Sequence, residues 1–138
     1  SESSRGVLRG LHFQKPPYTQ VKLVRCLKGS VLDVVLDLRK GSKTYGIFET
    51  ISLTEENKKQ LFIPKGFAHG YLTLSENADV NYKVDNYYNK NSEQGISFKD
   101  KYLNILSLRD ILVYEIPEIS DEIKKNSSYS KNAIQAAS

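Results

Sequence analysis

The chain has 138 residues, 39% of them hydrophobic, a length that suits one domain with a sizeable core and is too short for two. Its net charge is +4, but the basic residues are scattered, which favours an anionic small molecule over a nucleic acid as ligand. The single cysteine, Cys26, excludes an intrachain disulfide and favours a reducing compartment. No apolar run is long enough to span a bilayer, so we predict a soluble protein without a membrane partner.

In chain order, short strand patterns alternate with turn signals at a spacing of about ten residues, which is typical of an antiparallel sandwich or barrel. A short apolar segment over residues 6–14 precedes the first of them. Strands are predicted over residues 20–27, 31–38, 44–53, 61–63, 67–74, 79–84 and 96–98. Helix signals are nearly absent; residues 120–126 suit one or two helical turns after an N-cap at Ser120.

The stretch from Gln60 to Tyr88 joins two strands through a tight corner. Pro64 fixes φ and Gly66 accepts a positive φ, so His69 leaves the corner on a new strand. The next strand carries Tyr82 on its alternating face. We therefore expect the histidine and the tyrosine to face one cavity.

The strand over residues 31–38 divides into an apolar face and a second face that carries Asp33 and Asp37. Two carboxylates on one face indicate either that this face is functional or that it is the solvated outer face of a sheet. If strands 20–27 and 31–38 form a hairpin, two registers are open. One pairs Arg25 with Asp33 and the other pairs Lys22 with Asp37, and the sequence does not choose between them.

Few residues can carry chemistry near neutral pH. The chain has only two histidines, His12 and His69, and each has either a structural role or an acid and base role. Arg9 precedes His12 and suits a bidentate contact with a phosphate or carboxylate. Lys22 adds a cation on the following strand, unless its face of the sheet is simply exposed.

Four segments together resemble the dTDP-4-dehydrorhamnose 3,5-epimerase family, the RmlC-like cupins, over about residues 3 to 100. They are RGLHFQ at 9–14, KLVRCLKGSVLDVVLDLRKGSKTYG at 22–46, ENKKQLFIPKGFAHGYLTLSE at 56–76 and YKVDNYY at 82–88. The resemblance implies an all-β cupin jelly roll, followed here by a short irregular or helical C-terminal segment. It also implies a homodimer in the cytoplasm that acts on a nucleotide-diphospho sugar without metal or other cofactor.

The resemblance also assigns roles. Protons at C3 and C5 are α to the C4 ketone of the sugar, so a base can remove them and an acid can return them on the opposite face. His12 matches the base, Tyr82 the acid and Lys22 the lysine that steadies the enolate. The matching substrate-binding residues are Arg9 for the diphosphate, Tyr88 for stacking on the nucleotide base, and His69, Asp33 and Gln14 around the substrate.

The sequence departs from the family pattern in two places. Residues 1–138 are expected to form one cupin-type domain without the family's N-terminal segment, which supplies a strand. Near the other end, the family has an aspartate that orients the catalytic histidine, and the segment EISDEI at 118–123 places Ile123 there. Asp121 or Asp33 is left as the substitute.

Two alternatives stand beside an epimerase. The segment PKGFAH at 64–69 also fits the second motif of metal-dependent cupins, but those sites need an HxH pair and a carboxylate, and the first motif offers only His12. The absence of the orienting aspartate instead favours a sugar-nucleotide-binding cupin that does not catalyse. We predict the epimerase, inverting C3, C5 or both.

Overall fold

The computed structural model describes residues 1–96, and within them the chain forms nine strands and no helix. The strands are β1 (Glu2–Ser4), β2 (Leu8–Gln14), β3 (Lys22–Lys28), β4 (Ser30–Asp37), β5 (Phe48–Thr54), β6 (Gln60–Ile63), β7 (Phe67–Thr73), β8 (Asn77–Val84) and β9 (Glu93–Gly95). No helix in this part of the chain is long and apolar enough to cross a membrane. The helical turns predicted over residues 120–126, and the substitution at Ile123, lie outside the described residues.

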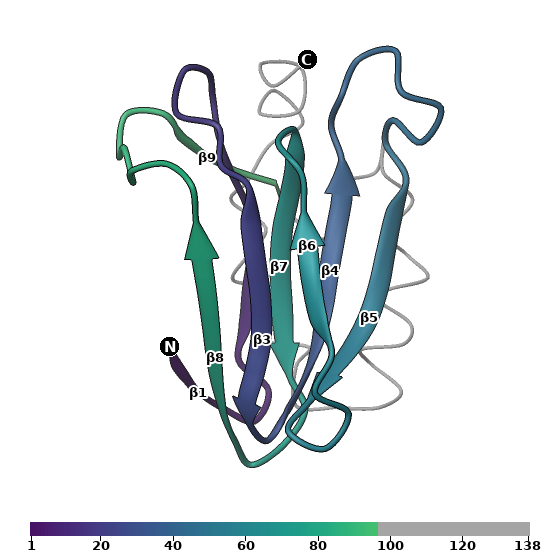
Figure 1. Cartoon of the computed structure of the whole chain (residues 1–138), viewed down its shortest axis with the longest axis vertical. Helices are drawn as coiled ribbons and strands as arrows, with labels where there is room; N and C mark the ends of the chain where they lie inside the picture. Colours follow the sequence, from purple (N-terminus) through teal and green to yellow (C-terminus); the bar gives the residue numbers. More distant parts are fainter. Residues whose placement is uncertain (97–138) are drawn as a thin grey trace.

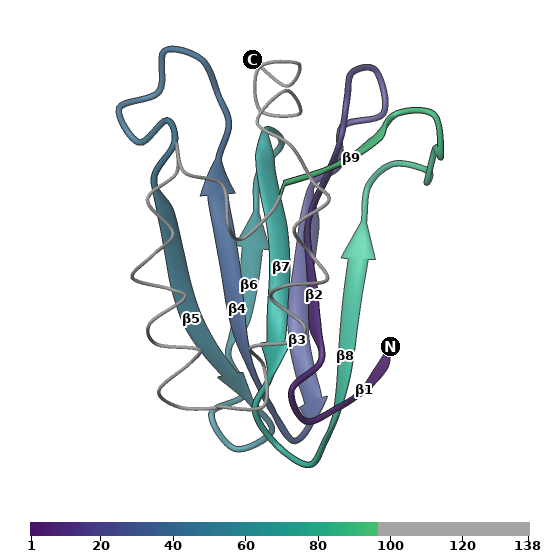
Figure 2. The ribbon, with the colours of Figure 1, turned by 180° about the vertical axis from the view of Figure 1, so that it is seen from behind.

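The strands build two antiparallel sheets that face each other (Figures 1 and 2). One sheet has four strands in the order β1-β8-β3-β6, and the other has five in the order β5-β4-β7-β2-β9. Strands that are consecutive in the chain often lie in opposite sheets, as β7 and β8 do. The predicted all-β jelly roll is confirmed.

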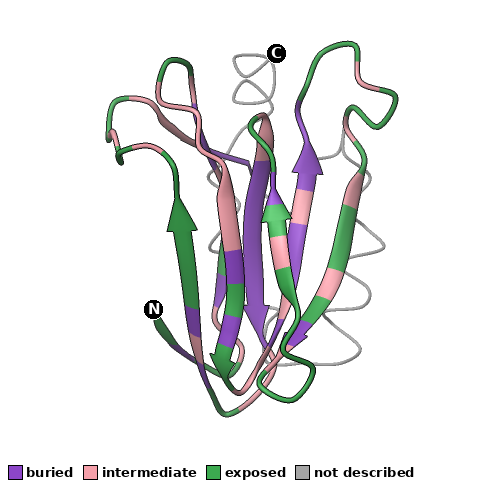
Figure 3. Ribbon diagram, in the orientation of Figure 1, coloured by how far each residue is buried: buried purple, intermediate pink, exposed green. Residues whose placement is uncertain are grey.

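Two hydrophobic clusters hold the sandwich together. The first lies between the sheets, where Val24 and Val80 of the four-stranded sheet pack with Val31 of β4. The second, which includes Leu11, Leu36 and Leu72, lies on the opposite face of the five-stranded sheet. The centre of that sheet is therefore buried on both faces, as the almost continuous buried colouring of β7 shows (Figure 3).

Strands β3 and β4 do not form a hairpin, so both predicted registers are wrong. A single residue, Gly29 with φ of +75°, joins them, and the chain passes from one sheet to the other there. Lys22 lies opposite Ile63 and Val84 in its own sheet. Sheet partners are chosen by long-range packing, which a local turn signal does not reveal.

The interpretation of Asp33 and Asp37 as part of a solvated outer face is also wrong. Both are buried, with exposed fractions of 0% and 1%. Alternation along β4 turns them toward the four-stranded sheet, on the same side as Val31. Buried carboxylates need polar partners; Asp33 contacts His69, and Asp37 accepts hydrogen bonds from several groups.

Asp37 also explains why β5 begins at Phe48 rather than at the predicted residue 44. Its carboxylate accepts hydrogen bonds from Arg39, Ser42 and Thr44, which hold the intervening segment as a loop. The Arg39 hydrogen bonds hold the pKa of Asp37 well below its usual range, helped by the two hydroxyls. The guanidinium of Arg39 in turn lies over the ring of Phe67, 4.8 Å from its centroid.

The ends of the described chain differ from the prediction as well. The polar N-terminal residues form β1, which pairs with β8 and was not predicted. Directly before the strand predicted over residues 96–98, the chain forms β9 at Glu93–Gly95, which pairs with β2. Residues 97 and 98 lie outside the described part.

Candidate active site

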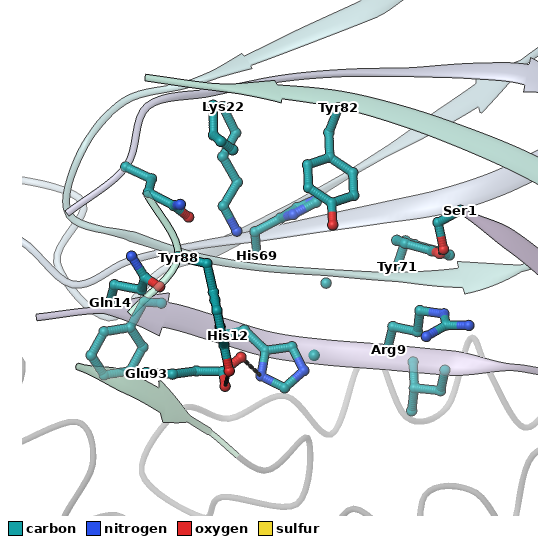
Figure 4. A pocket seen from close by; sticks show the side chains of 16 residues that line it. Ser1, Arg9, His12, Gln14, Lys22, His69, Tyr71, Tyr82, Tyr88 and Glu93 are labelled. Carbon is teal, nitrogen blue, oxygen red and sulfur yellow. Dashed lines mark hydrogen bonds and ion pairs between the residues drawn. The ribbon is translucent and has the colours of Figure 1, made fainter. Parts of the chain in front are cut away.

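A cleft of about 560 Å³ opens between the two sheets. Side chains from both sheets line it, as Figure 4 shows. Seven of the eight residues predicted for the site line this cleft: Arg9, His12, Gln14, Lys22, His69, Tyr82 and Tyr88. The eighth, Asp33, lies directly behind His69.

A bulge in β2 puts Arg9 and His12 on the same wall. Three residues apart on a regular strand, they would point to opposite faces. The pairing of β2 with β7 shifts by one residue between them, because Arg9 lies opposite Tyr71 whereas His12 lies opposite His69. The extra residue restores the alternation for the rest of the strand, so both side chains reach the cleft.

Gly10 makes this bulge possible. Its φ is +102°, a region that side chains rarely adopt. A Cβ on Gly10 would lie 2.6 Å from the Cα of Gly70 and from the backbone oxygen of His69. The two glycines let β2 and β7 approach at the point where both histidines enter the cleft.

The surroundings of His12 favour its neutral form. Desolvation by the cleft lowers the pKa of His12 below its usual value, and the charges of Lys22, His69 and Arg9 lower it further. Glu93 opposes them, since its Oε1 lies 3.8 Å from Nδ1 of His12. A neutral imidazole at neutral pH is able to accept a proton, as a general base must.

Lys22 and Tyr82 stand on the opposite wall, in the four-stranded sheet (Figure 4). Desolvation lowers the pKa of Lys22, while the charges of Asp33 and Glu93 raise it. Lys22 therefore interacts with Asp33 of the other sheet, and not with Asp37 as one of the predicted hairpin registers had it. The phenol of Tyr82 points into the cleft, and the residue is 54% exposed.

His69 is held from behind by Asp33. Its Nε2 lies 2.8 Å from Oδ2 of Asp33, and both side chains are buried. Among residues 1–96, no group hydrogen-bonds the other carboxylate oxygen, Oδ1. The sequence offers Asp33 or Asp121 as the carboxylate that orients His12, but in the structure the Asp33 carboxylate contacts His69.

Arg9 is oriented by a chain of hydroxyl groups. Its Nε donates to Oγ of Ser3 at 3.1 Å, and Ser3 Oγ lies 3.2 Å from the hydroxyl of Tyr71. The ring of Tyr71 is buried, so it anchors this chain to the core. The guanidinium is thereby placed at the cleft, and its Nη2 also donates to the backbone oxygen of Glu2 at 3.5 Å.

Gln14 and Tyr88 belong to the rim. The Gln14 amide donates to the backbone oxygens of Tyr18 and Tyr87 and accepts from the backbone N–H of Asn89. These bonds fix the loop that carries the tyrosines. The ring of Tyr88 is 65% exposed, which leaves room for a stacked ring, and its hydroxyl donates to Glu93 at 2.7 Å.

Sequence reasoning missed Glu93, Ser3 and Tyr71. Glu93 lies outside the strands predicted from the sequence, and only its pairing opposite Gln14 in β9 brings it to the cleft. Ser3 belongs to the strand that was not predicted. No group of three His, Cys, Asp or Glu side chains with the geometry of a metal site occurs within residues 1–96.

The fold and this cleft define a cupin jelly roll with His12 and Tyr82 on facing walls. The chain belongs to the dTDP-4-dehydrorhamnose 3,5-epimerase family, whose profile matches residues 1–130.

Individual relatives agree with the profile. The dTDP-4-dehydrorhamnose 3,5-epimerase of Shigella flexneri is 53% identical over 105 residues, which are 76% of this chain and 58% of that protein. The dTDP-4-dehydrorhamnose 3,5-epimerase of Elizabethkingia anophelis, known from a crystal structure, has 53% sequence identity with this chain. The match covers 76% of this chain and 57% of that chain, with a TM-score of 0.74.

A third relative was solved with a ligand. The crystal structure of dTDP-6-deoxy-D-glucose-3,5-epimerase from Legionella pneumophila, in complex with dTDP-4-keto-L-rhamnose, is 50% identical and superimposes with a TM-score of 0.72. It covers 75% of this chain and 54% of that chain. The chain thus spans somewhat more than half the length of the relatives that it matches.

Proposed function

We propose that this protein epimerises a nucleotide-linked 4-keto-6-deoxy sugar, of the type dTDP-4-dehydro-6-deoxyglucose, at C3, C5 or both. The ketone at C4 makes the neighbouring C–H groups acidic, because the electron pair left by the proton is delocalised onto the carbonyl oxygen as an enolate. The reaction therefore needs a base, an acid on the opposite face and a group that stabilises the oxyanion. Membership of the epimerase family supports this assignment.

In this proposal His12 removes the proton and Tyr82 returns one to the other face of the same carbon. The lowered pKa of His12 supports the first role, because its imidazole is mostly neutral at neutral pH. The single observation that carries the proposal is the placement of these two groups. His12 belongs to the five-stranded sheet and Tyr82 to the four-stranded sheet, so a sugar ring between them has one on each face.

The remaining predicted residues suit the rest of such a substrate. The ammonium group of Lys22 points into the cleft beside Tyr82, where it can stabilise the enolate oxygen (Figure 4). Arg9 has the fork geometry to bind the diphosphate, and the exposed ring of Tyr88 can stack on the base. We assign His69, held by Asp33, to the sugar, and Gln14 to the rim that carries Tyr88.

The experiment is solvent exchange. The intact protein is incubated with dTDP-4-keto-6-deoxyglucose in deuterated water, and proton NMR follows the C3 and C5 signals. We expect deuterium at C3, C5 or both, no detectable exchange with His12→Ala, and at least about 100-fold slower epimerisation with Tyr82→Phe. Lys90→Gln, an exposed change outside the cleft, is the matched control.

The same experiment separates the alternatives. A protein that binds the nucleotide sugar, measured by calorimetry, but exchanges neither proton is a binding module, and the epimerase proposal is then wrong. Exchange that is lost on treatment with a chelator would instead indicate a metal-dependent cupin.

We further infer that residues 1–138 act as one domain, in a homodimer and in the cytoplasm. Among residues 1–96 the outer edge of β1 has no partner strand, and this edge together with the exposed Phe62 on β6 supports association with a second copy. The free thiol of Cys26 supports a reducing compartment. Light scattering of the intact protein, together with its distribution after cell fractionation, tests both inferences.

A further inference from the structure

Glu93 lies between His12, the proposed base, and Tyr88, the proposed stacking ring. Its Oε2 accepts a hydrogen bond from the Tyr88 hydroxyl at 2.7 Å, while its Oε1 lies 3.8 Å from Nδ1 of His12. The two oxygens of one carboxylate thus contact the proposed base and the proposed stacking ring. Figure 4 shows the three side chains gathered at one end of the cleft.

The position of Glu93 is fixed by the backbone. Strand β9 pairs with β2 so that Glu93 lies opposite Gln14 and Gly95 lies opposite His12. The carboxylate therefore reaches His12 diagonally across two neighbouring strands, within the range of a cross-strand contact. The backbone N–H of Glu93 donates to the oxygen of Asn89, which ties the strand to the loop after Tyr88.

We propose that Glu93 is a positioning residue that holds the imidazole of His12 and the ring of Tyr88 in a fixed relation to each other. This inference rests on the proposed function. The carboxylate lies on the Nδ1 side of the imidazole, within ion-pair distance of that nitrogen. When His12 has taken up the proton of the substrate, the carboxylate stabilises the imidazolium that results.

The charges around His12 decide what removal of Glu93 will do. His12 faces Glu93 from β9, Lys22 from β3, His69 from β7 and Arg9 from β2. Glu93 is the one group of these four that favours the protonated imidazole. Replacing it with glutamine removes that favourable charge and leaves the three opposing ones, so His12 should titrate at lower pH.

The first test does not depend on activity. NMR of the imidazole protons follows His12 through a pH titration, and the spectrum of His69→Asn assigns the signals because the sequence has only two histidines. We expect the His12 titration to move to lower pH in Glu93→Gln and to stay unchanged in Glu49→Gln, an exposed change on β5. The difference should shrink at high salt, since both members of the pair are over one third exposed.

The second test measures coupling. We expect Glu93→Gln to lower kcat about 10-fold with a smaller change in KM, because the base is less well oriented. Tyr88→Phe removes one of the two contacts of the carboxylate. If Glu93 links the two residues, the double variant is little worse than Glu93→Gln alone.

The outcomes separate this inference from the proposed function. If the wild-type protein exchanges no proton of the sugar, the proposed function is wrong. The pH titration of His12 still decides whether Glu93 acts on its imidazole. Identical His12 titrations in wild type and Glu93→Gln, or strictly additive effects of the two substitutions, overturn the inference. Glu93→Asp, which keeps the charge, should recover most of the wild-type titration and exclude a purely steric effect.

Discussion

Nε2 of His69 lies 2.8 Å from Oδ2 of Asp33, in a contact that is buried on both sides. A carboxylate only accepts hydrogen bonds, so this contact places the proton of a neutral His69 on Nε2 and leaves Nδ1 as an acceptor. The same carboxylate supports the charge of Lys22 across the cleft. One buried side chain therefore acts on both walls.

Asp33→Asn tests this double role. The amide can donate to His69 as well as accept from it, so the histidine tautomer is no longer fixed, and Lys22 loses a favourable charge. We expect kcat/KM to fall about 10- to 100-fold and the free energy of unfolding to fall by about 1–3 kcal/mol. Steady-state kinetics and urea denaturation measure the two effects. Unchanged kcat/KM in a folded variant would show that neither contact matters for turnover.

Gly10→Ala tests the bulge in β2. The new Cβ would meet the backbone of Gly70 and His69 at a positive φ, so strain and overpacking add together. We expect a loss of about 3 kcal/mol or more in the free energy of unfolding. Gly41→Ala is the control, because Gly41 has φ of +80° but no atom within 4 Å of the new Cβ. Equal losses at the two positions would mean that the close approach of β2 and β7 is not what requires glycine.

Lys22→Gln tests the wall opposite the base. Removal of a cation that stabilises the enolate should lower kcat about 100- to 1,000-fold. Lys22 also lowers the pKa of His12, so its loss raises that pKa. Because the base must be neutral, the acidic limb of the kcat/KM profile should move to higher pH, opposite to the shift expected for Glu93→Gln. Lys28→Gln, exposed at the end of β3, serves as the control, and a shift to lower pH in Lys22→Gln would contradict the assignment.

Asp37→Asn tests stability in acid. The pKa of Asp37 is lowered in the folded protein, chiefly by Arg39, so its contribution to stability is present above the unfolded value of about 4. That contribution is lost as the pH falls from there toward the lower folded value. We expect Asp37→Asn to be less stable than wild type at pH 7, and the two midpoints of thermal unfolding to converge below pH 4. A constant gap between them down to pH 2 would contradict the linkage.

Much of this molecule was predictable because its signals are local. Alternation of apolar and polar residues, together with turn residues such as Pro64 and Gly66, located most strands to within one or two residues. Histidine is rare in this chain, so the sequence by itself points to His12 and His69. The family motifs added Gln14 and Tyr88 and assigned the roles, and seven of the eight predicted residues line the cleft.

The tertiary structure decided whatever depends on strands that are distant in the chain. Nothing local says that β3 and β4 lie in different sheets, or that Asp33 meets a histidine 36 residues away. The bulge at Gly10 puts Arg9 and His12 on the same side of β2, and Glu93 reaches His12 only because β9 pairs with β2. The physical reason is that a strand's character follows from its own residues, whereas its partner and register are set by the packing of the whole sandwich.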